Sequence, residues 1–323
     1  MTSRPMASGA ADSRPIPVLV GPTGVGKTAV GIELARRFGA EIVSADSRQV
    51  YRYMDIGTAK PTAEEQAAAP HHLIDVVDPD VRFSAGEYGR LSREAIQDLA
   101  DREVPALVVG GAGLYIKALA GGLFDAPEIP RALRQRLANE YRSASTDALH
   151  ERLSAVDPVS AARIHVNDRQ RIERALEVHD ATGATLTSWF ERPVQSRSRS
   201  RGMRLVGLRR DRAALYARTD ARVEKMIESG LEAEVRALMD RGYGPGTHAM
   251  STFGYAEMLR YIGGELELKD AVSAIQQRSR QYAKRQLTWF RQTEGIVWIT
   301  VDEGEDPAGT CEKIIRSFPD LLF

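Results

Sequence analysis

Short apolar runs alternate with amphipathic helical patterns over the first third of the chain. We expect strands at residues 16–20, 41–45, 72–76 and 106–109, and helices at residues 27–38, 84–102 and 114–120. Strands that alternate with helices of this length are typical of a parallel sheet with crossover helices. The pattern therefore predicts an α/β fold for this part of the chain.

The pattern changes between residues 125 and 201, where amphipathic helical segments follow one another without strand-like runs. Helices are expected at residues 131–142, 146–155 and 168–182, with prolines between them. Strand signals return at residues 203–208 and 295–301, and the helices expected between them are 212–229, 231–241, 254–261 and 268–290. We therefore expect a core built from residues 15–124 and 202–323, an all-helical insertion domain at 125–201, and a disordered tail at 1–14.

Composition restricts the class of protein without naming it. The chain has 323 residues, 44 basic and 44 acidic side chains, and one cysteine, Cys311. A single cysteine excludes a disulfide scaffold and a thiolate zinc site, and it fits a reducing cytoplasm. The sequence contains no run of eighteen apolar residues, so it predicts no membrane span. Zero net charge gives no general attraction to nucleic acid, although a local basic face is enough to bind it. We expect a cytoplasmic monomer.

A complete phosphate-binding loop follows the first expected strand. It consists of Gly21, Pro22, Thr23, Gly24, Val25, Gly26, Lys27 and Thr28. Its glycines allow a tight turn, and free amides at the start of the next helix favour an anion. We expect Lys27 to reach the terminal phosphate oxygens and the Thr28 hydroxyl to hold Mg²⁺. The loop alone does not distinguish a nucleoside triphosphate from another diphosphate.

Asp46 follows directly after the second expected strand. Ligands of open α/β sheets bind at the carboxyl ends of the strands, beside the phosphate loop. Three roles stay open from position alone: a general base, a carboxylate that holds Mg²⁺, or the N-cap of a following helix.

The fourth expected strand ends in Gly110 and Gly111, with no carboxylate nearby. An NTPase that works as a motor or switch would require acidic residues here, so their absence disfavours that class. The glycine pair suits either close approach of the backbone to a substrate or tight packing of helix on strand.

Residues 271–293 contain no acidic side chain. Their cations are Arg278, Arg280, Lys284, Arg285 and Arg291, and their aromatic residues are Tyr282, Trp289 and Phe290. Basic residues interleaved with aromatic ones suit a phosphodiester backbone, although a solvated helix face is the ordinary alternative. We expect Trp289 and Phe290 to lie in the core. Arg218 and Arg222 lie on one helix face, where guanidinium groups suit diphosphate oxygens.

Taken together, these motifs resemble the tRNA dimethylallyltransferase (isopentenyltransferase) family. The similarity covers the phosphate loop and residues 44–51, 54–61, 70–75, 109–115, 157–158, 174–178, 230–235, 254–255 and 284–289. The segments around Asp46 and at residues 57–61 are far more specific than the loop. The resemblance implies a P-loop NTPase-like core and a loop that binds dimethylallyl diphosphate. The acceptor implied is the exocyclic amine of the adenosine 3′ of the tRNA anticodon, in the anticodon stem-loop.

Residue roles follow from the same resemblance. Asp46 matches the general base, Thr23 a loop residue near the reacting centre, and Arg222 a diphosphate-binding arginine. Ser47, Arg48 and Gln49 match residues that hold the extruded adenine. The tRNA-binding set that the resemblance implies is Asp46, Ser47, Arg48, Gln49, Ala112, Arg134, Gln170, Arg171, Ile172, Glu173, Arg174, Ser251, Thr252, Phe253, Gly254, Tyr255, Ala256, Lys284, Arg285, Gln286, Leu287, Thr288, Trp289, Phe290 and Arg291.

Two departures from the family pattern matter. The family usually has Thr where this chain has Ala112, so a hydroxyl contact near the tRNA is lost or replaced. The zinc-finger tail of eukaryotic members is missing, which suggests a bacterial-type enzyme.

Two other functions use the same features. A P-loop kinase of a small metabolite or nucleotide would use the loop and Asp46 as base, but it does not explain the acid-free basic helix. A non-catalytic RNA-binding module does not explain the pair Lys27 and Thr28.

Overall fold

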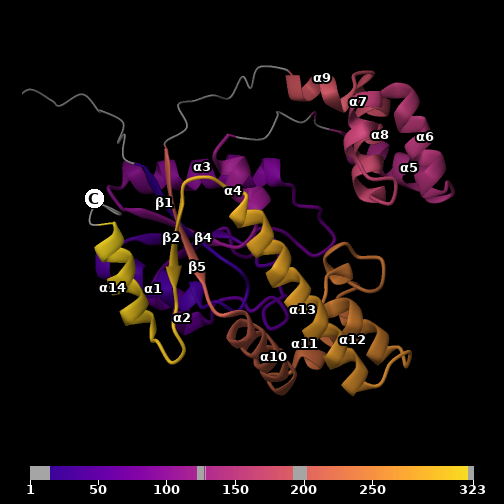
Figure 1. Cartoon of the computed structure of the whole chain (residues 1–323). Helices are drawn as coiled ribbons and strands as arrows, with labels where there is room; N and C mark the ends of the chain where they lie inside the picture. Colours follow the sequence, from indigo (N-terminus) through magenta and orange to yellow (C-terminus); the bar gives the residue numbers. More distant parts are fainter. Residues whose placement is uncertain (1–14, 122–126, 128, 192–201, 319–323) are drawn as a thin grey trace, which may run out of the picture. The chain divides into compact units, whose positions relative to one another are not determined.

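A parallel six-stranded sheet forms the centre of the core in the computed structural model, which describes residues 15–121, 127, 129–191 and 202–318 (Figure 1). The strands are β1 (Ile16–Val20), β2 (Glu41–Ala45), β3 (His71–His72), β4 (Ala106–Gly110), β5 (Met203–Arg209) and β6 (Ile296–Thr300). Their order in the sheet is β3-β2-β4-β1-β5-β6, and every pairing is parallel. The predicted α/β fold is therefore confirmed, with β1 at the centre.

Helices cover both faces of this sheet. In the core they are α1 (Lys27–Phe38), α2 (Ala63–Ala68), α3 (Ala85–Asp101), α4 (Gly113–Leu119), α10 (Arg212–Glu228), α11 (Leu231–Asp240), α12 (Tyr255–Ile262), α13 (Leu268–Arg291) and α14 (Pro307–Ser317), with a short 3₁₀ turn at Ala249–Ser251. Side chains alternate along each strand, so neighbouring residues enter different apolar layers. Val18 belongs to the layer shared with α3 and α4, whereas Leu19 belongs to the layer shared with α1 and α14. This double coverage explains why the central strands β1 and β4 are almost continuously apolar.

The chain divides into two compact units, one of residues 1–120 and 200–323 and the other of residues 121–199. The second unit contains α5 (Arg131–Arg142), α6 (Thr146–Val156), α7 (Pro158–Arg163), α8 (Arg169–Thr182) and α9 (Leu186–Glu191). Its own apolar core includes Leu153, Ile172 and Leu176. The predicted boundaries at residues 125 and 201, and the predicted tail at 1–14, lie outside the described residues.

The third strand is much shorter than the predicted 72–76. Leu73 and Asp75 have φ angles of 63° and 55°, in the left-handed region, so the chain cannot continue as a strand beyond His72. One isolated bridge between Tyr51 and Val77 follows. None of the helices in the described part of the chain is long and apolar enough to cross a membrane.

Candidate active site

The phosphate-binding loop connects β1 to α1 and leaves the first turn of that helix open to a ligand. Gly26 is the N-cap of α1 with φ 107°, and it provides no side chain to bond the first-turn amides. Gly24 has φ 82°, and a Cβ there would lie 2.7 Å from Thr219 Oγ1. Both positions therefore require glycine. The loop has the backbone geometry of an anion site at a helix N-terminus.

Three side chains with hydroxyl or cationic groups meet at this loop. Arg222 on α10 donates from Nη2 to Thr23 Oγ1 at 2.7 Å, and Lys27 Nζ donates to the Pro22 carbonyl at 2.8 Å. The buried Arg222 Nε has no hydrogen-bond partner among the described residues. The cations Arg222 and Lys27 thus lie beside the loop, and Arg222 keeps one N–H that an anionic ligand could accept.

Burial changes the acidity of both cations. Desolvation lowers the pKa of Lys27 to about 8, partly opposed by the negative charge of Asp46. Desolvation and the positive charge of Arg48 lower the pKa of Arg222 to about 10. Placing these charges out of bulk water is unfavourable without a counterion, so the site favours a ligand that carries negative charge.

Asp46 lies at the end of β2 and faces a pocket beside the loop. Its Oδ1 accepts a hydrogen bond from the Arg48 amide at 2.9 Å, which fixes the carboxylate in a tight turn. The residues that line the pocket are Thr23, Asp46, Arg48, Gly57, Thr58, Arg222, Met226, Phe253, Gly254, Ile275, Ser279 and Tyr282. The carboxylate of Asp46, the hydroxyl of Thr23 and the guanidinium of Arg222 therefore share one pocket, and the sequence had named all three as site residues.

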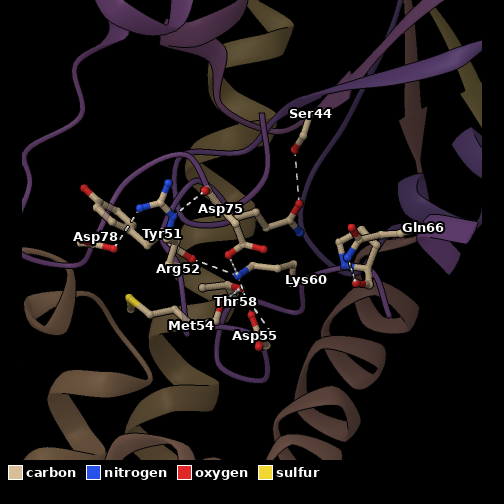
Figure 2. Close-up of polar contacts among 12 residues, drawn as sticks. Ser44, Tyr51, Arg52, Met54, Asp55, Thr58, Lys60, Gln66, Asp75 and Asp78 are labelled. Carbon is tan, nitrogen blue, oxygen red and sulfur yellow. Dashed lines mark hydrogen bonds and ion pairs between the residues drawn. The ribbon is translucent and has the colours of Figure 1, made fainter. Parts of the chain in front are cut away.

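The loop after β2 forms one wall of the pocket, and polar contacts hold it in place. Figure 2 shows Lys60 between Asp55 and Asp75, with Nζ–Oδ1 distances of 2.5 and 2.6 Å, and Nζ also reaches the Tyr51 carbonyl at 2.9 Å. The Lys60 side chain is only 3% exposed. On the other side, the Glu234 carboxylate accepts hydrogen bonds from the backbone amides of residues 55–57. These contacts explain why residues 54–61 form such a distinctive sequence motif.

Arg48 joins this wall to the segment before α12. Its Nη2 donates to the carbonyls of Gly57 at 2.8 Å and Phe253 at 2.7 Å, and its guanidinium lies 4.1 Å from the centre of the Phe253 ring. Arg48 therefore holds the loop after β2 against the segment at residues 251–256, which the resemblance assigns to tRNA contact.

Helix α13 ties the phosphate loop to the Gly-Gly turn after β4. Gln286 Oε1 accepts from the Thr23 amide at 2.7 Å, and Nε2 donates to the Gly111 carbonyl at 2.9 Å. A Cβ on Gly111 would lie 2.2 Å from Gln286 Nε2, so this glycine is required for close packing. Of the two explanations left open for the glycine pair, tight packing is the one that the contacts at Gly111 support.

Several side chains expected to touch tRNA are buried. Ile172, Tyr255 and Phe290 are at most 1% exposed, and Gln286 is 5% exposed. In this structure the four side chains have little or no exposed surface through which to contact RNA directly. The prediction that Trp289 lies in the core is wrong, because its side chain is 40% exposed. Its indole lies against Gly113, where a Cβ would be 2.1 Å from Nε1.

The cations of α13 do not form one free basic face. Arg278 pairs with Glu257 at 2.9 Å and Arg280 pairs with Asp220 at 2.6 Å. Lys284, Arg285 and Arg291 are exposed. In the helical unit, Arg134 and Arg174 both pair with Glu177, and Arg171 pairs with Asp168. Ion pairing by the protein itself therefore reduces the charge that arginine content suggests.

Ala112 is the N-cap of α4 and makes no side-chain cap. A threonine there would offer an oxygen to the first-turn amides. With alanine at this position, the N-terminus of α4 has no side-chain cap.

Comparison with known proteins agrees with this geometry. A family model described as IPP transferase matches residues 49–293. The chain is 46% identical to tRNA dimethylallyltransferase 1 of Syntrophotalea carbinolica, over 96% of each chain. It is 47% identical to the tRNA dimethylallyltransferase of Syntrophobacter fumaroxidans, over 95% of this chain and 89% of that one.

The chain is also similar to solved structures of transferases that act on tRNA. The tRNA isopentenylpyrophosphate transferase of Bacillus halodurans is 37% identical, with a TM-score of 0.69 over 96% of this chain and 97% of that chain. A eukaryotic dimethylallyltransferase acting on tRNA is 26% identical, with a TM-score of 0.77 over 94% of this chain and 78% of that one.

Proposed function

The chain belongs to the IPP transferase family, and we propose that it transfers the dimethylallyl group of dimethylallyl diphosphate to tRNA. The acceptor is the exocyclic amine of the adenosine on the 3′ side of the anticodon, and the product is N6-dimethylallyladenosine. One observation carries the proposal: Asp46 shares a pocket with Thr23 of the phosphate loop and Arg222 of α10.

The reaction is a substitution at the allylic carbon. The amine nitrogen forms a bond to this carbon while the bond from carbon to the diphosphate oxygen breaks, and the electron pair leaves with diphosphate. Lys27 and Arg222 offset the charge that grows on the leaving group, and Asp46 accepts the proton that the amine loses. The adenine must leave its stack to reach this pocket, as other base-modifying enzymes require.

Mg²⁺ fits the donor set at the loop. No group of three or more His, Cys, Asp or Glu side chains among the described residues could hold a metal alone. Mg²⁺ commonly takes only one or two protein oxygens and completes its shell with phosphate oxygens and water. Thr28, partly exposed in the first turn of α1, would hold it. When bound, the ion would supply charge neutralisation at the diphosphate.

The kinase alternative is less consistent with the site. A kinase of this class also needs carboxylates for the metal, and the turn after β4 instead has Gly111, whose carbonyl is occupied by Gln286. Nucleotide consumption separates the two functions. Incubation with dimethylallyl diphosphate and unmodified tRNA, without nucleotide, should release one diphosphate per modified tRNA. Stoichiometric release of ADP from added ATP would instead support the kinase.

The exposed cations of α13 should contribute to tRNA affinity through phosphate contacts. Replacing Lys284 and Arg285 together by alanine is expected to flatten the log–log dependence of tRNA affinity on salt by about 1.5, because each phosphate contact contributes roughly 0.7 to 0.9. The measurement is a binding titration across salt concentrations. The matched control is Arg90→Ala with Arg236→Ala, which removes two cations that already pair with glutamates. An equal slope for both double variants would show that this part of α13 does not meet RNA.

A further inference from the structure

Two long helices, α10 and α13, contribute side chains to the lining of the pocket. Arg280 on α13 pairs with Asp220 on α10 at 2.6 Å, and Gln276 reaches Glu224 at 3.4 Å. The contact that lies earlier in α13 lies later in α10, so the two helices are antiparallel neighbours. Figure 1 shows α13 extending from the region of α12 toward α4.

The side chains that face the pocket follow the helical period on both helices. On α10 they are Arg222 and Met226, four residues apart and on the same face. On α13 they are Ile275, Ser279 and Tyr282, at spacings of four and three. Gln286 continues the same face and is bonded to the Thr23 amide. One end of this row is thereby fixed at the phosphate loop.

Polarity changes along this row. Near the loop, the guanidinium of Arg222 donates to the hydroxyl of Thr23 at 2.7 Å, and Ser279 and Tyr282 add hydroxyl groups to the pocket lining. One helical turn further, about 6 Å along the axis, lie Met226 and Ile275. Met226 is 9% exposed and Ile275 is 1% exposed. An allylic diphosphate has the same polarity, with an anionic head and a short apolar tail.

We propose that Met226 and Ile275 close the allylic end of the pocket and limit transfer to the five-carbon group. This inference rests on the proposed function. Both are buried side chains one turn beyond the charged end, so a five-carbon chain held by Thr23 and Arg222 reaches them. A ten-carbon chain would have to displace them, and close packing of the interior resists such displacement.

The test compares geranyl diphosphate with dimethylallyl diphosphate in the full chain with unmodified tRNA. The readout is the ratio of the two kcat/KM values, geranyl over dimethylallyl, measured on one preparation. Met226→Ala and Ile275→Ala should each raise this ratio at least about tenfold. A single methylene in an apolar pocket already changes selectivity by about 10- to 200-fold. Because both values come from one preparation, partial unfolding cancels in the ratio.

Met258→Ala is the matched control, since Met258 is fully buried in the same core and does not line the pocket. It should leave the ratio unchanged. An unchanged ratio in both pocket variants, or an equal rise in the control, overturns the inference. Failure of the parent enzyme to transfer the dimethylallyl group would instead overturn the proposed function, so the two failures are distinguishable.

Discussion

Replacing Asp46 by asparagine is expected to lower kcat by about 10²- to 10⁴-fold while leaving affinity for the diphosphate almost unchanged. The exocyclic amine of adenine is a poor nucleophile because its lone pair is delocalised into the ring. A carboxylate that accepts an amine proton returns electron density to the nitrogen as the new bond forms. Asparagine keeps an oxygen that accepts the Arg48 amide hydrogen bond, so the turn after β2 is preserved and only basicity is lost.

The measurement is kcat and diphosphate affinity of the Asp46→Asn variant across a Mg²⁺ titration. If Asp46 held Mg²⁺ instead, diphosphate affinity would fall and additional Mg²⁺ would partly restore turnover. Near-normal turnover would leave Asp46 only its role in the local turn. Asp78→Asn is the control, because Asp78 is an exposed carboxylate that pairs with Arg52 and does not line the pocket.

Replacing Lys27 by methionine should reduce kcat/KM for dimethylallyl diphosphate by about 10²- to 10³-fold and at the same time stabilise the folded protein. The catalytic loss follows from removing a preorganised positive charge beside the leaving group. The gain in stability follows from the pKa of Lys27, which desolvation lowers from 10.5 to about 8. At neutral pH the fold thus contains a charged group in an environment that disfavours the charge.

The sign of the pH dependence follows from proton binding. Between about pH 8 and 10.5 the unfolded chain binds more protons at Lys27 than the folded chain, so stability rises with pH in this window. Below pH 8 Lys27 is charged in both the folded and the unfolded chain, so its full destabilisation of the fold is present. We therefore expect Lys27→Met to be more stable by about 1–3 kcal/mol at pH 7, with a smaller advantage at pH 10. Urea unfolding at the two pH values measures both differences.

Lys117→Met, which removes an exposed lysine from α4, is the control and should change stability by less than about 0.5 kcal/mol. Equal stability of Lys27→Met and the parent at pH 7 would show that the Lys27 charge is well solvated. The same pKa predicts that diphosphate affinity of the parent falls as pH rises above about 8, because the ammonium loses its charge.

Much of the fold could be predicted from the sequence because the core elements repeat a clear pattern. Helix α1 was predicted with its observed bounds, since apolar spacing, the preceding glycines and Gly39 all indicate the same segment. Helix α2 was missed because it buries no side chain, although Thr62 and Glu65 form a capping box. Helix α14 was missed despite Asp306 and Pro307 at its start. For both helices, the capping residues were the signal in the sequence that could have predicted the N-terminus.

The site was predictable only where a single segment carries the chemistry. The phosphate loop and Asp46 each follow a strand, so position alone indicated them. Met226, Ile275 and Tyr282 line the pocket only because α10 and α13 pack as antiparallel neighbours, which no local pattern specifies. Trp289 was misplaced for a related reason. The face of α13 that turns inward carries Gln286 and Phe290, and Trp289 lies outside it.

The proposed reaction of this pocket joins a dimethylallyl group to the exocyclic amine of an adenosine in tRNA. The most direct measurement uses radiolabelled dimethylallyl diphosphate and two otherwise identical anticodon stem-loops. One has adenosine 3′ of the anticodon, and the other has inosine, which lacks the amine. We expect label in the adenosine stem-loop and none in the inosine one. Label in both, or in neither, would contradict the proposed reaction.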